Sequence, residues 1–421
     1  AIDIFYMVNA GGITLTDAEL ALAQISGYWE DARELFKKKL FELSDKGFSF
    51  KLDFIVYVLL GIIYQSGDEM KKLHGSENSE KIKEVWNILD KYVLDYVVNI
   101  IRSKGFVDHT DEINSYYALI PIIVYYYKKF TKGDKAFSND EINKILRWFY
   151  YSQIRNRYVS QLPQKLTKDN KIAWESTTPF ENLLSLIEEE RSLTITESEF
   201  EGRNVSHPLY KLCLFYFKSK NAVCLTTKVP IHQPMGKMYK LEKDHIFPYS
   251  VLKKRGYAMG EDKYRLAQEF TNRAILTGFA NRDKSDKSAE NYLNLIDEET
   301  LNLQSIPTNK DYWKLENYEN FLAERRKILS EQLNNFLTSL SKKGSVEAIV
   351  SIDSIIEKGE SDELEFKSTY QWNLETNQTD KNLVQAILKT IAAFSNTDGG
   401  TLLIGVNNNG EIVGLESDYK C

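Results

Sequence analysis

An acid and a histidine stand side by side at Asp244 and His245, within the stretch 241–252 (LEKDHIFPYSVL). A histidine can take a proton from water as a general base, and a carboxylate beside it can bind a hard divalent cation. Hydrolysis of a phosphodiester needs both functions, because water must be activated and the charge that develops on the phosphate oxygens must be neutralised. The pair therefore points to metal-assisted phosphodiester hydrolysis as the chemistry to look for downstream.

Two asparagines further along the chain fit the same chemistry. Asn272 and Asn281 stand nine residues apart in FTNRAILTGFANRDKS, and Arg282 and Lys284 closely follow the second one. A short apolar run between polar ends is typical of a strand, here one that leads into a helix carrying a ligand. The side-chain oxygens of asparagine and aspartate are the kind of ligand that Mg²⁺ accepts.

The set Asp244-His245-Ile-x-Pro248, Asn272 and Asn281-Arg-x-Lys-Ser285 resembles the HNH motif of ββα-metal nucleases, in particular the HNH domains of CRISPR effector nucleases and of GmrSD-type restriction endonucleases. The resemblance implies that His245 is the general base and that Asp244 and Asn281 bind the metal, which would be Mg²⁺ (or Mn²⁺). It also implies that Asn272 braces the loop that bears the base and that Lys284 faces the scissile phosphate. The implied substrate is DNA.

The same resemblance implies a local structure. Residues 238–290 should form a two-stranded antiparallel ribbon followed by a helix, so that Asp244, His245 and Asn281 converge. The segment 253–271 (KKRGYAMGEDKYRLAQEFT) is longer than a tight turn between strands needs, and it is either a DNA-contacting insertion or simply a longer loop. The residues expected to contact DNA are Lys253, Lys254, Arg255 and Arg282. The Cys₄ zinc scaffold that many HNH domains carry is not found in this sequence.

Positive charge is concentrated around this motif. The net charge of the chain is −6, which on its own argues against a nucleic-acid-binding protein. Residues 201–293, however, hold 17 lysines and arginines against nine acids, so the rest of the chain is strongly acidic. A positive segment of this kind suits the phosphate backbone of a nucleic acid. The alternatives are a solvated charged face and, for the Asp244-His245 pair, a capped strand end without a catalytic role.

Helices must position this motif, because apolar residues recur at helical spacing up to about residue 220. The pattern Thr16-x-x-Glu19 predicts a capping box at a helix start. The residues predicted to form buried helix faces are Val85, Trp86, Leu89, Val93, Tyr96, Val97, Ile100, Ile142, Ile145, Trp148 and Phe149. The polar stretches 66–81 and 162–171 are expected to be connectors. A further helix is expected between residues 311 and 343, with a domain boundary near 345.

Two further histidines are expected to have structural or surface roles. His207 precedes a proline and is expected to cap a helix, whereas His232 lies in a proline-rich stretch upstream of the motif. Either histidine could instead line the site. Their positions outside the matched motif favour the structural alternative.

The start of the chain carries a second resemblance. The stretch 5–20 (FYMVNAGGITLTDAEL) resembles the end of the ParB-like N-terminal domain of GmrSD-type proteins. Asn9, Gly11 and Gly12 are expected to shape the backbone there, because glycine permits positive φ. The Asp-Gly-Gln-Gln-Arg-like nucleotide-binding signature of that domain is not found in these residues, so nucleotide binding would need an upstream domain. Both ends of the chain are expected to be cuts in a longer protein.

The last part of the chain carries a third resemblance. In 356–372 (IEKGESDELEFKSTYQW) apolar and polar residues alternate as in a strand, and Asp380 is expected to cap a helix that follows. Asn409-Gly410 predicts the turn of a hairpin. With AFSNTDGGTLLIGV (393–406), these residues resemble the AlbA-like DNA-binding domain of the Schlafen type.

In nuclease members of that family, two glutamates and a later acid bind metal. Glu360, Glu365 and Lys367 are therefore a candidate second site. The later acid is replaced here by Asn407-Asn408, which favours binding of DNA over cleavage by this part. A structural ion pair between Glu365 and Lys367 is the alternative.

Composition frames these expectations. The chain has 421 residues, of which 43% are hydrophobic and 27% are charged, so it is expected to be globular. It has no apolar run of eighteen residues, so no membrane segment is expected. Its three cysteines have no metal-like spacing, which fits a cytoplasmic protein. The expected fold class is α+β: a mainly helical N-terminal half, a ββα-metal HNH nuclease domain and a small α/β Schlafen AlbA-like domain. The expected domains are 1–30 (end of a ParB-like domain), 31–200 (helical linker), 201–345 (HNH nuclease with flanking helices) and 351–421 (Schlafen AlbA-like).

Two functions follow from these expectations. One is a metal-dependent HNH endonuclease that cuts DNA in restriction or anti-phage defence. The other is a nucleic-acid-binding regulatory protein that uses the AlbA-like module and carries an inactive HNH scaffold. The intact set of Asp244, His245, Asn272 and Asn281 favours the endonuclease, because an inactive site would be free to lose His245. The oligomeric state is not predicted.

Overall fold

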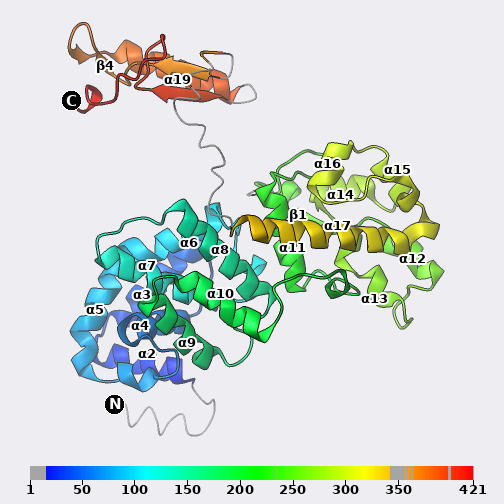
Figure 1. Ribbon diagram of the computed structural model, residues 1–421, viewed down its shortest axis with the longest axis horizontal. Helices are drawn as coiled ribbons and strands as arrows, with labels where there is room; N and C mark the ends of the chain where they lie inside the picture. The colour runs from blue at the N-terminus through cyan, green and yellow to red at the C-terminus, as the bar shows by residue number, and fades with distance from the viewer. Residues whose placement is uncertain are drawn as a thin grey trace. The chain divides into compact units, whose positions relative to one another are not determined.

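The structure, a computed structural model, describes residues 16–232, 234–341, 356, 359–361, 364–396 and 400–420. The chain divides into two compact units, Ala1–Lys343 and Gly344–Cys421 (Figure 1). Helices predominate and the sheets are small, so the fold is α+β as predicted. Among the described residues, no helix has both the length and the apolar character that crossing a membrane requires. Asn9, Gly11 and Gly12 lie outside the described residues.

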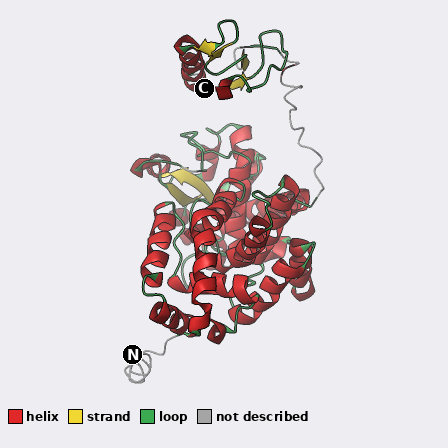
Figure 2. Cartoon of the chain, turned by 90° about the vertical axis from the view of Figure 1, so that its left-hand side faces the viewer, coloured by secondary structure: helices red, strands yellow, loops and turns green. Residues whose placement is uncertain are grey.

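The first unit is largely helical. Its longer helices are α2 Asp17–Tyr28, α3 Ala32–Asp45, α4 Leu52–Tyr64, α5 Ser79–Ile88, α6 Leu94–Ser103, α7 Leu119–Thr131, α8 Asn139–Ile154, α9 Leu162–Glu175, α10 Pro179–Glu190, α11 Pro208–Ser219 and α17 Tyr318–Ser339. Its shorter helices are α12 Tyr249–Leu252, α13 Tyr264–Ala267, α14 Gly278–Lys284, α15 Ala289–Leu293 and α16 Glu298–Leu303. Its strands are β1 Leu241–His245 and β2 Arg273–Thr277, which Figure 2 shows among the helices.

The predicted helix start and buried faces of this unit are confirmed. Thr16 caps α2 through a capping box, in which its side chain accepts from the Glu19 N–H and the Glu19 side chain accepts from the Thr16 N–H. Of the residues predicted to be buried, Val85, Trp86, Leu89, Val93, Val97, Ile142, Ile145, Trp148 and Phe149 are buried, and Tyr96 and Ile100 are half-buried. Helical spacing of apolar residues was therefore a sound guide to this core.

The segment 162–171, predicted to be a polar connector, is instead the greater part of α9. Pro163 stands in the first turn, where its missing N–H costs no helical hydrogen bond. Asp169 is fully buried, and its two oxygens accept from Arg157 Nε at 2.7 Å and Arg157 Nη2 at 2.6 Å. The prediction was wrong because polar side chains can lie in a core when a partner satisfies them, here Arg157 from the turn before α9.

Two hydrophobic cores underlie the first unit, and α17 takes part in both. The larger core is formed mainly by the helices from α2 to α11, and the smaller core lies around β1 and β2. Leu333 and Leu337 of α17 belong to the larger core, whereas Phe321 and Leu322 belong to the smaller one. This long helix, yellow in Figure 1, therefore ties the helical part of the unit to the part that contains β1.

The two strands and the helix after them have the order predicted for residues 238–290. β1 pairs antiparallel with β2, from Leu241 opposite Thr277 to His245 opposite Arg273. α14 begins directly after β2, and the Thr277 side chain caps it by accepting from the Ala280 N–H at 3.2 Å. The side chains predicted to form the site are therefore carried by short elements joined without a loop at the β2–α14 junction.

His207 caps α11, as predicted. Its Nδ1 accepts from the Leu209 N–H at 3.3 Å. Burial, and to a lesser degree the positive charge of Arg203, lowers the pKa of His207 to about 4. The cap needs the neutral ring, because a protonated Nδ1 has no lone pair to accept with.

We therefore expect His207 to make the stability of the fold depend on pH. The pKa of an unfolded histidine is about 6.5, so between pH 6.5 and about 4 the unfolded chain binds more protons at this position and stability falls as the pH falls. In His207→Asn, which keeps a capping side chain, this contribution should be missing. Thermal melts at several pH values should show a steeper loss in the native chain than in the variant. Equal slopes would contradict the prediction.

The second unit contains two small sheets and a long helix. β3 Leu364–Lys367 pairs parallel with β6 Thr401–Ile404, β4 Trp372–Asn373 pairs antiparallel with β5 Gln378–Thr379, and α19 spans Lys381–Ser395. Asp380 caps α19 as predicted, accepting from the Asn382 N–H at 2.9 Å. Leu364 and Phe366 alternate with polar residues in β3 and are buried, which confirms the predicted strand.

The hairpin predicted around Asn409-Gly410 is only partly formed. Gly410 has a φ of +80°, as a turn glycine can adopt. Within the described residues, the pairing across the turn consists of a single bridge between Val406 and Ile412. Val406 also packs with Leu364 and Phe366 in the small core of this unit.

Candidate functional site

Side chains of two α14 residues, Lys284 and Asn281, contact β1 and define the candidate site. Lys284 donates from Nζ to Asp244 Oδ2 at 2.7 Å and to the His245 backbone carbonyl at 2.7 Å. The Lys284 side chain is 2% exposed and that of Asp244 is 21% exposed, so water screens this ion pair only partly. One turn earlier on α14, Asn281 Nδ2 donates to Glu242 Oε2. Glu242 and Asp244 therefore share the face of β1 that α14 covers, as alternation along a strand requires.

Asn272 holds the loop that follows His245. The asparagine is fully buried, its Oδ1 accepts from the Phe247 N–H at 2.8 Å, and its Nδ2 donates to the Phe247 carbonyl at 3.1 Å. Its own carbonyl accepts from the Ile246 N–H at 2.8 Å. Three hydrogen bonds from one residue fix the backbone directly after β1, and this geometry suits the bracing role that the HNH resemblance implies.

The His245 ring lies on the other face of β1, opposite Arg273. Arg273 Nη1 is 3.0 Å from His245 Nδ1. A guanidinium can only donate, so Nδ1 carries the lone pair and the proton of the neutral ring is on Nε2. Burial, reinforced by the positive charges of Arg273 and Lys284, lowers the pKa of His245 to about 3. The imidazole is therefore neutral near pH 7, as a general base must be, and Nδ1 is its basic atom.

A buried guanidinium fixes the start of β2. Arg325 of α17 is 2% exposed and donates to four backbone carbonyls: Thr271 and Arg273 at 2.7 Å each, Gln304 at 2.8 Å and Ser305 at 3.1 Å. These carbonyls offset the cost of burying the charge. Burial lowers the pKa of Arg325 to about 10, so the side chain stays protonated near pH 7. α17 therefore holds the segment that bears the bracing asparagine.

The oxygen atoms of this site suit a hard divalent cation. Asp244 offers a carboxylate, and Asn281 offers the amide oxygen that its contact with Glu242 does not use. Among the described residues, no group of three or more histidines, cysteines, aspartates or glutamates is placed to hold a metal ion. Mg²⁺ needs no such cage, because it usually binds one or two protein oxygens and keeps several waters. The donors therefore fit Mg²⁺ or Mn²⁺.

The structure brings together most of the residues predicted for this site. Asp244 and Asn281 point to the same β1–α14 interface, although each contacts a different partner there. Lys284, predicted to face a phosphate, contacts Asp244. His245 reaches this interface only with its backbone carbonyl. The prediction that His245 converges with Asp244 and Asn281 was therefore wrong for its side chain, because adjacent residues of a strand point to opposite faces and the His245 ring faces Arg273.

Two residues of the site were not predicted. Glu242 contacts Asn281, and Arg273 contacts the His245 ring. The signal for Glu242 was its position two residues before Asp244, which puts both acids on one face of a strand. The signal for Arg273 was weaker, because it depended on the register of the two strands.

The residues predicted to contact DNA are exposed to solvent. Lys253, Lys254 and Arg255 form the 3-10 helix η8 Lys253–Arg255, and Arg282 lies on α14. Within the part of the chain that the structure describes, none of these four residues forms an ion pair, so their charges are available to phosphates. The segment 253–271 also contains α13, so it is a partly helical connection between the strands.

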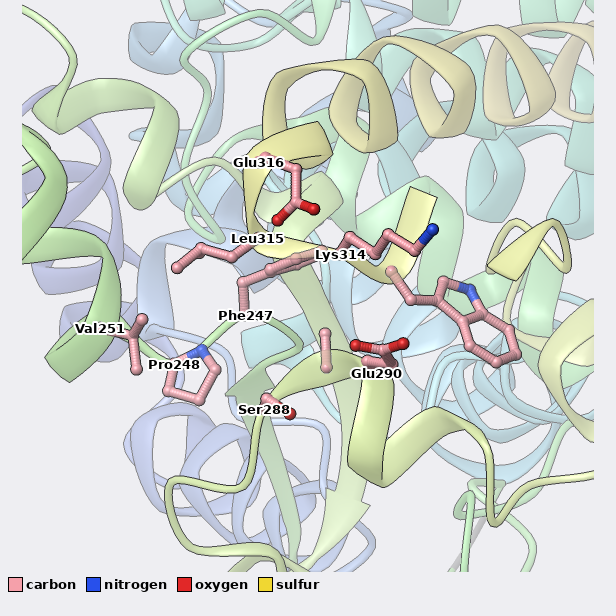
Figure 3. A pocket seen from close by; sticks show the side chains of 10 residues that line it. Phe247, Pro248, Val251, Ser288, Glu290, Lys314, Leu315 and Glu316 are labelled. Atoms are coloured by element: carbon pink, nitrogen blue, oxygen red, sulfur yellow. The ribbon is translucent and has the colours of Figure 1, made fainter. Parts of the chain in front are cut away.

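A pocket of about 320 Å³ lies beside the braced loop (Figure 3). It is lined by Phe247, Pro248 and Val251 from the loop and α12, by Ser288, Ala289 and Glu290, and by Trp313, Lys314, Leu315 and Glu316. Glu242, Asp244, Asn281 and Lys284 are not among its lining residues. Its two carboxylates also make it a poor site for a phosphate, so it is separate from the candidate site.

The glutamates of the second unit take part in local contacts. Glu360 Oε1 accepts from the Phe366 N–H at 2.9 Å, and Glu365 forms an ion pair with Lys367. Asn407, where nuclease members of the resembled family carry an acid, donates from its side chain to a carboxylate later in the same turn. These contacts favour the structural alternative for the Glu365–Lys367 pair.

Comparison with known proteins gives a match for the second unit. Residues 360–421 are similar to the family described as Schlafen, AlbA_2, which is the resemblance predicted for this part of the chain. No curated protein matches the chain significantly. The family match points to nucleic-acid binding by the second unit.

Proposed function

We propose that this chain is a metal-dependent endonuclease of the HNH type that hydrolyses phosphodiester bonds of DNA, in restriction or anti-phage defence. The observation that carries the proposal is the meeting of Asp244, Asn281 and Lys284 between β1 and α14, next to the neutral His245. Oxygen ligands for a cation and an ammonium group lie on one face of β1, and the neutral imidazole lies on the other face; these are the kinds of group that hydrolysis of a phosphodiester requires. The nucleic-acid-binding family of the second unit suits the same substrate.

In this proposal His245 takes the proton of the attacking water at Nδ1, the atom that carries the lone pair. Arg273, which donates to that atom, has to release it, and an incoming phosphate offers the guanidinium a stronger acceptor. Asp244 and Asn281 would hold Mg²⁺ or Mn²⁺, which when bound neutralises charge on the phosphate oxygens. Lys284 adds a second positive charge beside Asp244.

Nicking of supercoiled plasmid in Mg²⁺ tests the proposal and locates the cleavage. The intact chain is expected to nick, and Glu365→Ala should nick at the same rate because its carboxylate serves a local ion pair. A chain without Gly344–Cys421 should bind DNA more weakly yet still nick at low salt, where phosphate contacts by the basic segment are strongest. Modified and unmodified plasmids should both be assayed. Loss of nicking in Glu365→Ala, with His245→Ala still active, would move the catalytic centre to the second unit.

A second candidate function is favoured by the family match of residues 360–421. The chain would then be a nucleic-acid-binding regulatory protein that uses its AlbA-like module, with an inactive HNH scaffold. This function predicts binding of DNA without metal-dependent nicking by the intact chain or by any variant. The plasmid assay therefore separates the two candidates.

A further inference from the structure

We infer that Glu242 is a positioning residue of the proposed metal site, whose carboxylate orients the Asn281 amide so that its oxygen is presented to the cation. The inference rests on the proposed function, in which Asp244 and Asn281 bind the metal. Glu242 would act through Asn281 and would not itself be a ligand.

The contact between Glu242 and Asn281 has only one chemically allowed direction. An ionised carboxylate can only accept, so the amide atom that faces Glu242 Oε2 must be Nδ2. The oxygen and nitrogen of a planar amide point in different directions, so the contact turns Oδ1 away from Glu242. A flip of the same amide would present an NH₂ group, which cannot bind a cation.

The fold holds the Glu242 carboxylate against the start of α14. Glu242 lies opposite Leu276 in the β1–β2 pair. Leu276 stands two residues before Gly278, the first residue of α14. A Cβ atom at Gly278 would lie 3.0 Å from Glu242 Oε1, so the missing side chain leaves room for the carboxylate. Oε1 therefore packs against the first turn of the helix while Oε2 accepts from Asn281.

The two acids on this face of β1 have partners of different charge. Asp244 contacts the Lys284 ammonium, which balances its charge. Glu242 contacts a neutral amide and, within the described part of the chain, forms no ion pair. Its uncompensated charge would also attract a divalent cation from a distance. An experiment must therefore separate orientation of Asn281 from simple attraction.

Binding of Mn²⁺ reports on the site without DNA cleavage, because the paramagnetic resonance signal of free Mn²⁺ is lost on binding. In Glu242→Gln the new side chain can both donate and accept, so it no longer selects one orientation of Asn281. We expect Mn²⁺ to bind about 10- to 100-fold more weakly, the range found for partners of metal ligands. The matched control is Asp283→Asn, which removes an exposed acid from the same helix and should leave binding nearly unchanged in physiological salt.

The variant Asn281→Asp separates orientation from charge. An aspartate at this position presents an oxygen in either orientation, so Glu242 has nothing left to orient and only repels it. If Glu242 acts by orientation, Glu242→Gln weakens Mn²⁺ binding in the native chain but not in Asn281→Asp. Weakening of equal size in both backgrounds would overturn the inference, since Glu242 would then act by charge or as a ligand.

Failure of the proposed function would look different. Mn²⁺ binding that is absent from the native chain, or unaffected by Asp244→Asn, would refute the metal site and the inference together. Binding that depends on Asp244 but is unchanged in Glu242→Gln would refute the inference alone. Thermal melts of each variant establish that weaker binding does not arise from unfolding.

Discussion

His245→Ala is expected to abolish metal-dependent nicking of plasmid, with a loss of rate on the order of 10²–10⁴-fold. The reason is that His245 Nδ1 is an unprotonated nitrogen at the end of β1, and alanine has no atom that can accept the proton of water. Folding should be retained, because Asn272 holds the loop after β1 and Arg325 holds β2 without help from the imidazole. The measurement is single-turnover nicking in saturating Mg²⁺.

Two controls separate catalysis from binding in this test. One is the affinity of His245→Ala for DNA, and the other is the same substitution at a second histidine, His232. His245 is neutral near pH 7 and adds no charge toward phosphates, so duplex DNA should bind His245→Ala about as tightly as the native chain. His232 has different partners, since its Nδ1 is 3.0 Å from Asp108 Oδ1 and its ring packs against the Phe106 ring. His232→Ala should therefore nick at the native rate. A near-native rate in His245→Ala would place the general base elsewhere.

The order of the elements at the site could be predicted because it is local in the sequence. Asn272 directly precedes a five-residue strand, and Asn281 lies in the first turn of the helix that follows it, so their spacing fits both elements. The partners of the side chains could not be predicted in the same way. The contacts of Asn281 with Glu242 and of Lys284 with Asp244 depend on how closely α14 packs against β1, which the missing side chain of Gly278 permits.

Contacts that no local pattern reports explain the other omissions. Arg325 fixes β2 from a position 52 residues after Arg273, and no local pattern distinguishes it from the other cations of its helix. Asp169 lies in a polar stretch that looked like a connector, yet Arg157 makes it a core residue. A sequence pattern reports the polarity of a residue, but burial of a polar group is decided by the partner that reaches it.

The second unit shows the reverse case, in which a contiguous motif was easier to identify than its packing. The Schlafen-type pattern lies in one stretch, and residues 360–421 match that family. Ile387 and Ile391 of α19 are four residues apart, as on one face of a helix, but they differ in burial: Ile387 is 2% exposed, whereas Ile391 is 47% exposed. An amphipathic pattern identifies the apolar face of a helix but does not specify how much of it is covered.

Asp244→Asn is expected to lose binding of Mn²⁺ and nicking together, but the Lys284 ammonium complicates this test. Lys284 is almost fully buried and pairs with Asp244, so the variant leaves its charge without an acidic partner at that position. Removing one member of a fully buried pair costs about 3–5 kcal/mol. The cost here should be smaller because Asp244 is 21% exposed. Loss of activity in this variant alone could therefore arise from unfolding.

The double variant Asp244→Asn/Lys284→Met removes that ambiguity. Methionine keeps much of the length of lysine without its charge, so thermal melts should return toward those of the native chain. Binding of Mn²⁺ and nicking should stay lost if Asp244 is a metal ligand. Lys284→Met alone should still bind Mn²⁺, because Asp244 remains and is freed of a competing cation, but it should nick more slowly because a positive charge beside the phosphate is gone. A double variant that regains both stability and nicking would show that Asp244 serves only to pair Lys284, and the metal would then have to be held by other residues.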